Sequence, residues 1–106
     1  MDPKVKRLVD QVKAHLHETY GEGIKRVIVY GSRARGEATK DSDVDVLVLV
    51  GQSLNPREVD DSLGDPLYDV LLEEGELVSA IVIPEDFFEN HSLPFMLNVR
   101  KEGVTV

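Results

Sequence analysis

Two neighbouring stretches of the chain decide the fold. The first reads Val27-Ile-Val-Tyr-Gly-Ser-Arg-Ala-Arg-Gly36, and the second reads Ser42-Asp-Val-Asp-Val-Leu-Val-Leu-Val50. Each contains a mostly apolar run, and a run without polar alternation is typical of a strand that is covered on both faces. The first run ends in a glycine-serine turn, and the second begins with two aspartates. The stretches therefore predict two buried strands with polar side chains at their ends.

The polar residues at these strand ends point to a ligand. Asp43 and Asp45 are one residue apart, so on a strand their carboxylates point to the same side. The Gly31-Ser32 turn can bring backbone N–H groups close to a phosphate. Taken alone, Gly31-Ser32 is equally well explained as an ordinary tight turn, and the two aspartates as the solvated start of a strand. Together, at this spacing, they predict a site for a divalent metal that carries a nucleoside triphosphate.

Length and composition narrow the classes of protein to consider. A chain of 106 residues predicts a single domain over residues 1–106. The absence of cysteine excludes disulfides and thiolate metal sites, and it suits a cytoplasmic location. No apolar run approaches the ~20 residues of a membrane helix, and no signal-peptide segment is recognisable. A net charge of −8 disfavours direct binding to nucleic acid. We therefore expect a cytoplasmic protein with neither membrane nor nucleic-acid partners.

The hydrophobic pattern predicts the α/β (α+β) class, with a small mixed sheet of three to four strands and flanking helices. Strands are expected over residues 25–30, 43–50 and 77–83, with a short extra strand at 104–106. Helices are expected over residues 3–20 and 56–63. A further helix should end near residue 75, a short one should begin at Pro84, and a last one should cover 92–102. Asp2 and Asn55 each precede a proline and are expected to cap the helix that follows.

The spacing of the motifs resembles a known signature. Gly31-Ser32, a gap of ten residues and Asp43-Val44-Asp45 resemble the signature of the DNA polymerase β-like nucleotidyltransferases. The short chain and the Gly-Ser-Arg-Ala-Arg-Gly form resemble the minimal nucleotidyltransferase (MNT) group. This resemblance implies transfer of a nucleotidyl group from a Mg²⁺-bound triphosphate, with Mn²⁺ as an alternative ion. It also implies that Asp43 and Asp45 are catalytic metal ligands and that Gly31 and Ser32 contact the triphosphate.

The same resemblance suggests a protein partner. Many MNT proteins are antitoxins paired with a HEPN-domain ribonuclease toxin, and some add AMP to that toxin. The resemblance therefore implies transfer of AMP from ATP to a small helical HEPN-type protein. The alternative is a catalytically weak or inactive antitoxin, or a nucleotide-binding module, that acts by protein contact.

The chain departs from the MNT pattern at one position. Active members usually carry a third carboxylate on the strand after the aspartate pair, and residues 77–83 contain neither Asp nor Glu. By position Ser79 replaces that carboxylate, and Glu76 at the start of the strand is the candidate substitute ligand. Loss of general-base help lowers a rate by roughly 10²–10⁴-fold. Metal–nucleotide binding is therefore expected to survive better than transfer.

Two arginines follow the glycine-serine turn. Arg35 is expected to bind the nucleotide through bidentate hydrogen bonds to triphosphate oxygens. Arg33 is open to the same role. The alternative for both is a surface pair with Glu37 or Asp41, and such pairs contribute little to stability.

Overall fold

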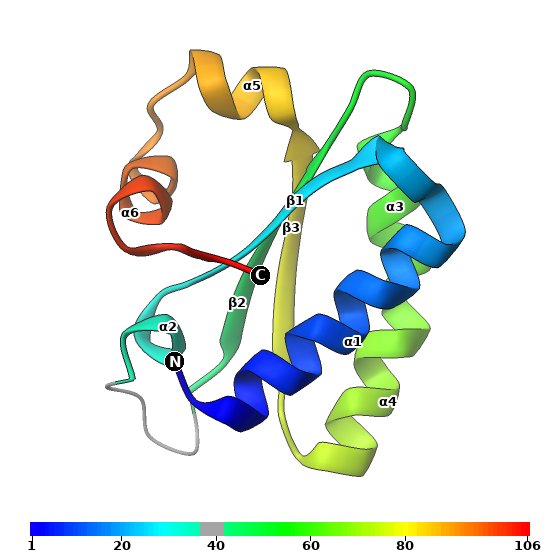
Figure 1. Ribbon diagram of the computed structural model, residues 1–106, viewed down its shortest axis with the longest axis vertical. Coiled ribbons are helices and arrows are strands. Elements are labelled where there is room, and N and C mark those ends of the chain that lie inside the picture. The colour runs from blue at the N-terminus through cyan, green and yellow to red at the C-terminus, as the bar shows by residue number, and fades with distance from the viewer. Residues whose placement is uncertain (37–41) are drawn as a thin grey trace.

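A single mixed sheet organises the chain (Figure 1). The computed structural model describes residues 1–36 and 42–106. Its strands are β1 (Ile24–Tyr30), β2 (Val44–Val50), β3 (Val78–Pro84) and β4 (Val104–Thr105), in the order β3-β2-β1-β4. β1 is antiparallel to β2 and to β4, whereas β2 and β3 are parallel. The predicted mixed sheet is confirmed, with the carboxyl-terminal residues as its fourth strand.

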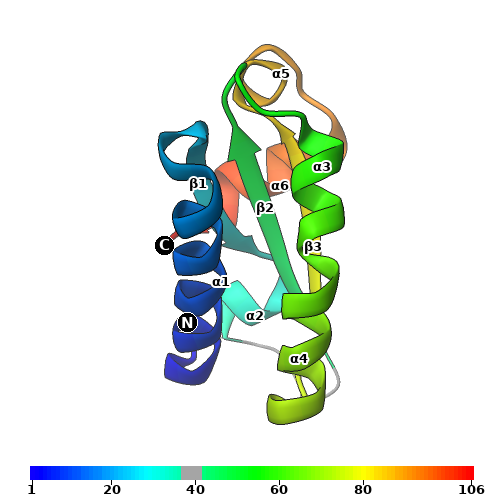
Figure 2. The same cartoon turned by 90° about the vertical axis from the view of Figure 1, so that its right-hand side faces the viewer.

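Helices cover both faces of this sheet. Figure 2 shows one layer of helices, made of α1 (Pro3–Tyr20), α3 (Pro56–Ser62) and α4 (Gly64–Glu74), on one side of the strands. On the other side lie α5 (Glu85–Asn90) and α6 (Pro94–Glu102). A one-turn helix, α2 (Ser32–Arg35), follows β1 directly, and a 3-10 turn at Gly21–Gly23 joins α1 to β1. None of the helices in the described residues is long and apolar enough to span a bilayer.

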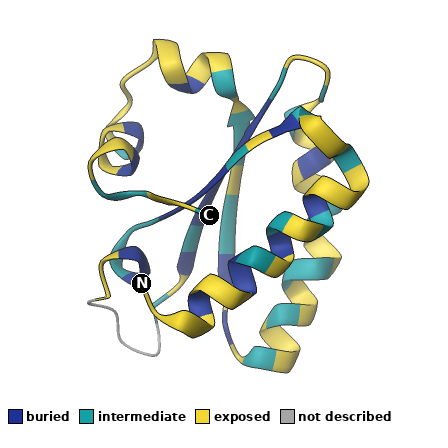
Figure 3. Cartoon of the chain, in the orientation of Figure 1, coloured by how far each residue is buried: buried dark blue, intermediate teal, exposed yellow. Residues whose placement is uncertain are grey.

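The two central strands bury alternate side chains in two separate cores, and Figure 3 shows how completely they are covered. Val27, Val46 and Val48 pack in the core that α1 and α3 close. Ile28 and Leu47 face the opposite side, in the core that contains Phe88, Met96 and Val99. This double burial explains why the strands show no polar alternation. It also places the odd-numbered residues of β2, Asp45 among them, on the face that carries α5 and α6.

The helix boundaries follow from local chemistry. The Asp2 carboxylate accepts a hydrogen bond from the Lys4 backbone N–H at 2.8 Å, and the Asn55 side chain accepts one from Arg57 N–H at 2.9 Å. Both predicted caps are confirmed. The expected interruption between the third and fourth helices falls at Leu63, just ahead of the Gly64-Asp65-Pro66 segment that predicted it.

Candidate nucleotide and metal site

The turn after β1 brings backbone and carboxylate into close approach. Gly31 has φ 77°, a left-handed conformation that favours glycine. A Cβ at this position would lie 2.6 Å from Asp45 Oδ2, so no side chain fits there without displacing the carboxylate. The Gly31 carbonyl accepts hydrogen bonds from the N–H groups of Ala34 and Arg35 and starts α2 at Ser32. The structure thus places the glycine-serine turn directly against the second aspartate, as its motif predicted.

Asp45 lies at the centre of a row that crosses three strands. Its register partners are Tyr30 on β1 and Ser79 on β3, and paired residues share a face of the sheet. Asp43 precedes β2 by one residue and shares that face. The Ser79 hydroxyl donates to Asp43 Oδ2 at 3.5 Å. The predicted position of Ser79 beside the aspartate pair is therefore confirmed by the geometry.

The electrostatics of this row favour a cation. Burial, and secondly the charge of Asp43, raise the pKa of Asp45 above its ordinary value. Burial and the charge of Asp45 likewise raise the pKa of the Tyr30 hydroxyl. Both shifts mean that further negative charge is unfavourable here unless positive charge is supplied.

The donor set fits a metal that arrives with its own oxygen ligands. Within residues 1–36 and 42–106, no group of three or more carboxylate, histidine or cysteine side chains is placed to hold a metal ion. Two carboxylates and the Ser79 hydroxyl remain. Mg²⁺ is commonly bound through one or two carboxylates together with substrate phosphates and water. The chemistry of Asp43 and Asp45 therefore suits a metal–triphosphate better than a bare ion in a protein cage.

Glu76 is not the substitute ligand that its position in the sequence suggested. Arg33 donates to both of its carboxylate oxygens, from Nη1 at 2.8 Å and from Nη2 at 3.2 Å, and Lys4 Nζ lies 3.6 Å away. The hydrogen bonds from Arg33 hold the pKa of Glu76 below its ordinary value despite burial. Both oxygens are occupied by a cation, so the expectation that Glu76 would complete the metal site is wrong.

The two arginines of the turn have different partners. The Arg33 guanidinium also donates to the Ser42 carbonyl at 2.8 Å and is buried, so it does not present a free fork to a triphosphate. Arg35 donates from Nη1 to both oxygens of Glu102 on α6, at 2.8 and 2.7 Å, and its side chain is 39% exposed. Glu37 and Asp41, the sequence-based candidates for pairing, lie outside the described residues. Sequence reasoning missed Glu102 because nothing local marks a contact across 67 residues.

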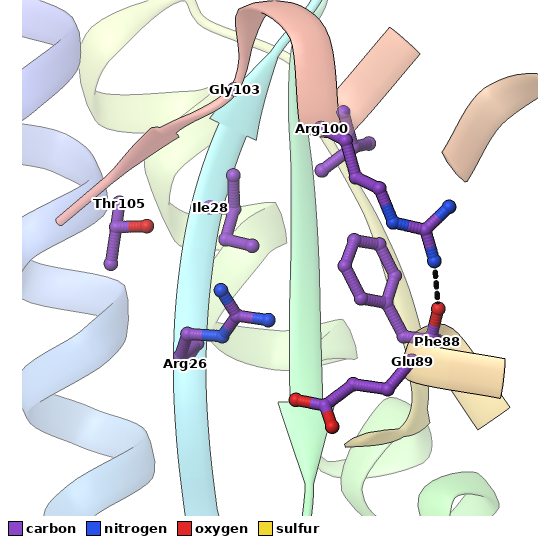
Figure 4. A pocket seen from close by; sticks show the side chains of 8 residues that line it. Arg26, Ile28, Phe88, Glu89, Arg100, Gly103 and Thr105 are labelled. Carbon is purple, nitrogen blue, oxygen red and sulfur yellow. Dashed lines mark hydrogen bonds between the residues drawn. The ribbon is translucent and has the colours of Figure 1, made fainter. Parts of the chain in front are cut away.

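A separate cavity of about 420 Å³ lies between the β1–β4 edge and the two helices of the same face (Figure 4). Arg26 and Ile28 line it from β1, and Phe88 and Arg100 line it from α5 and α6. Arg100 donates to the Phe88 carbonyl, and its guanidinium lies 4.6 Å from the centre of the Phe88 ring. No residue of the predicted site lines this cavity, so the aspartate pair occupies a different part of the face.

Fold and site together define a class of protein: a small mixed α/β domain that gathers a glycine-serine turn and paired carboxylates at the ends of its central strands. A family model described as "Nucleotidyltransferase domain" matches residues 6–102. A relative from Methanocaldococcus jannaschii, named "Putative protein adenylyltransferase", is 36% identical over 101 residues, which are 93% of this chain and 90% of the relative. The chain belongs to the nucleotidyltransferase domain family, and the resemblance seen in the motifs is confirmed.

Solved structures share the fold at low sequence identity. A "putative nucleotidyltransferase" from Sulfolobus solfataricus is 18% identical, with a TM-score of 0.57 over 96% of this chain and 78% of that chain. A chain of a crystal structure described as "toxin-antitoxin with AMP-PNP" is 15% identical, with a TM-score of 0.60 over 91% and 69% of the two chains. These likenesses confirm the predicted fold class.

Proposed function

We propose that this protein binds ATP with Mg²⁺, or Mn²⁺ in its place, and transfers AMP to a hydroxyl group of a partner protein. The observation that carries the proposal is the close approach of the Asp45 carboxylate to the Gly31 backbone, which leaves no room for a Cβ. It joins a phosphate-binding type of turn to a metal-binding type of side chain. Membership of the nucleotidyltransferase family and the name of the relative from Methanocaldococcus jannaschii support the same reaction class.

The residues take separate roles in this proposal. Asp43 and Asp45 would hold the metal, and the Ser32 hydroxyl and the Gly31 backbone would contact triphosphate oxygens. Arg35 would turn part of its guanidinium toward the triphosphate while Glu102 orients the rest. When bound, the metal neutralises charge on the triphosphate and on the departing pyrophosphate.

The transfer itself exchanges one phosphorus–oxygen bond for another. The acceptor hydroxyl oxygen bonds to the α-phosphorus, and the bond from that phosphorus to the oxygen bridging to the β-phosphorus breaks. Pyrophosphate leaves, and the hydroxyl proton passes to water. The described residues put no third carboxylate beside Asp43 and Asp45 to take that proton, because Ser79 is neutral. We therefore expect slow transfer, lacking the roughly 10²–10⁴-fold contribution of a general base.

The serine favours a second candidate function. With Ser79 in place of a carboxylate, the protein would bind a metal–nucleotide and neutralise a small helical HEPN-type toxin by contact alone. The structural neighbour described as a toxin–antitoxin with AMP-PNP makes such a partner worth testing.

Two isotopic labels distinguish these functions. The protein is incubated with MgCl₂, ATP labelled at the α- or the γ-phosphate, and a small helical HEPN-type protein as candidate acceptor. Transfer of AMP predicts that the α label moves to the partner and the γ label does not. Metal-dependent ATP binding in calorimetry without label transfer favours the contact antitoxin. Absence of metal-dependent binding contradicts both functions.

A further inference from the structure

One guanidinium holds three segments of the candidate site together. Arg33 Nη1 donates to the Ser42 carbonyl and to Glu76 Oε2, both at 2.8 Å, and Nη2 donates to Glu76 Oε1 at 3.2 Å. The side chains are closed off from solvent, since Arg33 is 7% and Glu76 11% exposed. A planar guanidinium fork fixes direction as well as distance, because its donors point along set lines.

Each of the three segments carries a residue of the candidate site. Arg33 follows Ser32 in α2, and Ser42 precedes Asp43 at the entry of β2. Glu76 precedes β3, on which Ser79 lies beside the aspartates. Figure 2 shows α2 next to the start of β2. The guanidinium therefore joins the Gly31-Ser32 turn to the entry of β2, which carries Asp45, and to the entry of β3.

Stability alone is a weak explanation for such a pair. The free energy needed to remove two charges from water offsets much of the free energy gained from their attraction. Apolar side chains of similar size therefore often stabilise a protein equally well. A second arginine–glutamate pair provides a comparison. Arg7 donates to both oxygens of Glu74 at 3.3 and 3.4 Å on the surface, and this pair joins only α1 to α4. The buried pair differs in its additional bond to the chain just ahead of Asp43.

We propose that Arg33 and Glu76 are positioning residues, whose buried pair holds the Gly31-Ser32 turn at the distance from Asp43 and Asp45 that lets one metal–triphosphate contact both. This inference rests on the proposed function. Neither residue touches the ligand in this account. They act by holding α2 against the entries of β2 and β3.

The proposed role of the Arg33–Glu76 pair can be tested because the Gly31-Ser32 turn and the aspartates come from different elements. A metal ion alone needs only the aspartates, of which Asp45 lies on β2 and Asp43, one residue ahead of it, is also held by the Ser79 hydroxyl on β3. ATP with the metal needs the aspartates and the turn in register. Loss of the pair should therefore spare binding of the bare metal and weaken the mutual enhancement between metal and ATP.

The test measures binding of Mn²⁺ by electron paramagnetic resonance, with and without ATP. Arg33→Met combined with Glu76→Met removes the pair without stranding a buried charge. We expect a folded protein by circular dichroism, an unchanged affinity for Mn²⁺ alone, and an ATP-induced enhancement reduced by about tenfold or more, since misplacement by ~1 Å is costly at such sites. Arg7→Met combined with Glu74→Met is the matched control and should keep the wild-type enhancement.

The outcomes separate this inference from the proposed function. Wild-type enhancement in the folded Arg33→Met, Glu76→Met variant overturns the positioning role and leaves the proposed function standing. If that variant does not fold, Arg33→Lys decides, because an ammonium keeps the charge but loses the planar fork. A reduced enhancement in folded Arg33→Lys supports the role, and an undiminished one overturns it. No enhancement in the wild type overturns the proposed function and the positioning role together.

Discussion

At the scale of single residues, the backbone of Gly31 determines how closely the turn approaches the carboxylate of Asp45. Its positive φ and the 2.6 Å that would separate a Cβ from Asp45 Oδ2 are independent obstacles to a side chain. Either obstacle alone would favour glycine. Together they make the position a sensitive probe of the site.

Replacing Gly31 by alanine should destabilise the protein by more than backbone strain alone. A positive φ costs a non-glycine residue roughly 1–2 kcal/mol, and displacement of the Asp45 carboxylate adds to that cost. Gly75→Ala is the matched control, because Gly75 has φ 68° and open space around its Cβ position. Urea denaturation of both variants measures the difference. Equal losses would show that the close approach to Asp45 has no energetic consequence.

Neutralising the aspartates should leave the metal-free protein as stable as before or slightly more stable. Burial, and then Asp43, raise the pKa of Asp45, so the stability linked to this group is present at low pH and is lost as pH rises through its folded pKa. At neutral pH the charged form is therefore a cost, which Asp43→Asn with Asp45→Asn removes. Thermal melts without metal test this, and a large fall in Tm would make the aspartates structural. Val46→Asp should be far worse, because it buries an unpaired charge.

Among the helices and strands, the ion pairs that α2 makes with other elements determine the shape of the site. The helix caps at Asp2 and Asn55 could be predicted because a cap and the N–H it accepts from lie two residues apart. The double burial of β1 and β2 could be predicted because their apolar runs lack alternation. The pairs Arg33–Glu76 and Arg35–Glu102 could not, because they span 43 and 67 residues and depend on how the elements pack. Hence Glu76 was expected in the metal site and is found in an ion pair.

The Arg33–Glu76 pair should make the protein sensitive to acid. Arg33 lowers the pKa of Glu76, so the stability linked to this carboxylate is present above its unfolded pKa near 4.5 and is lost as pH falls through the lower folded value. Below pH 4.5 the free energy of unfolding of the wild type should fall more steeply with pH than that of Glu76→Gln. Urea titrations between about pH 3 and 6 measure both slopes. Parallel slopes would contradict the depressed pKa.

The edge strand β3 offers a direct test of the missing carboxylate. Ser79 is the register partner of Asp45 and donates to Asp43, so Ser79→Asp would add a third carboxylate to the pair. Like-charge repulsion should lower the Tm of the metal-free variant, and Mg²⁺ should restore it, which makes Tm more dependent on Mg²⁺ than in the wild type. Transfer of AMP should rise by about a hundredfold if a base was lacking. A variant with wild-type metal dependence and transfer would show that position 79 does not serve the site.

In the whole molecule, the sheet brings side chains that are distant in the sequence into one row. Tyr30, Asp45 and Ser79 come from three strands and meet through register alone. The motif spacing in the sequence indicated the first two of these strands. The family model matches a wider range, residues 6–102. In the proposed function, the acidic pair Asp43 and Asp45 is completed by a cation that arrives with the nucleotide.

In the proposed function, Asp43 and Asp45 join a metal to a triphosphate held at the Gly31-Ser32 turn. Titration calorimetry of ATP binding, with and without Mg²⁺, tests it most directly when the wild type is compared with Asp43→Asn, Asp45→Asn. We expect Mg²⁺ to increase the ATP affinity of the wild type by about tenfold or more, a difference of ~1.4 kcal/mol, and to leave the ATP affinity of the double variant unchanged. Equal enhancement by Mg²⁺ in the two proteins would contradict it.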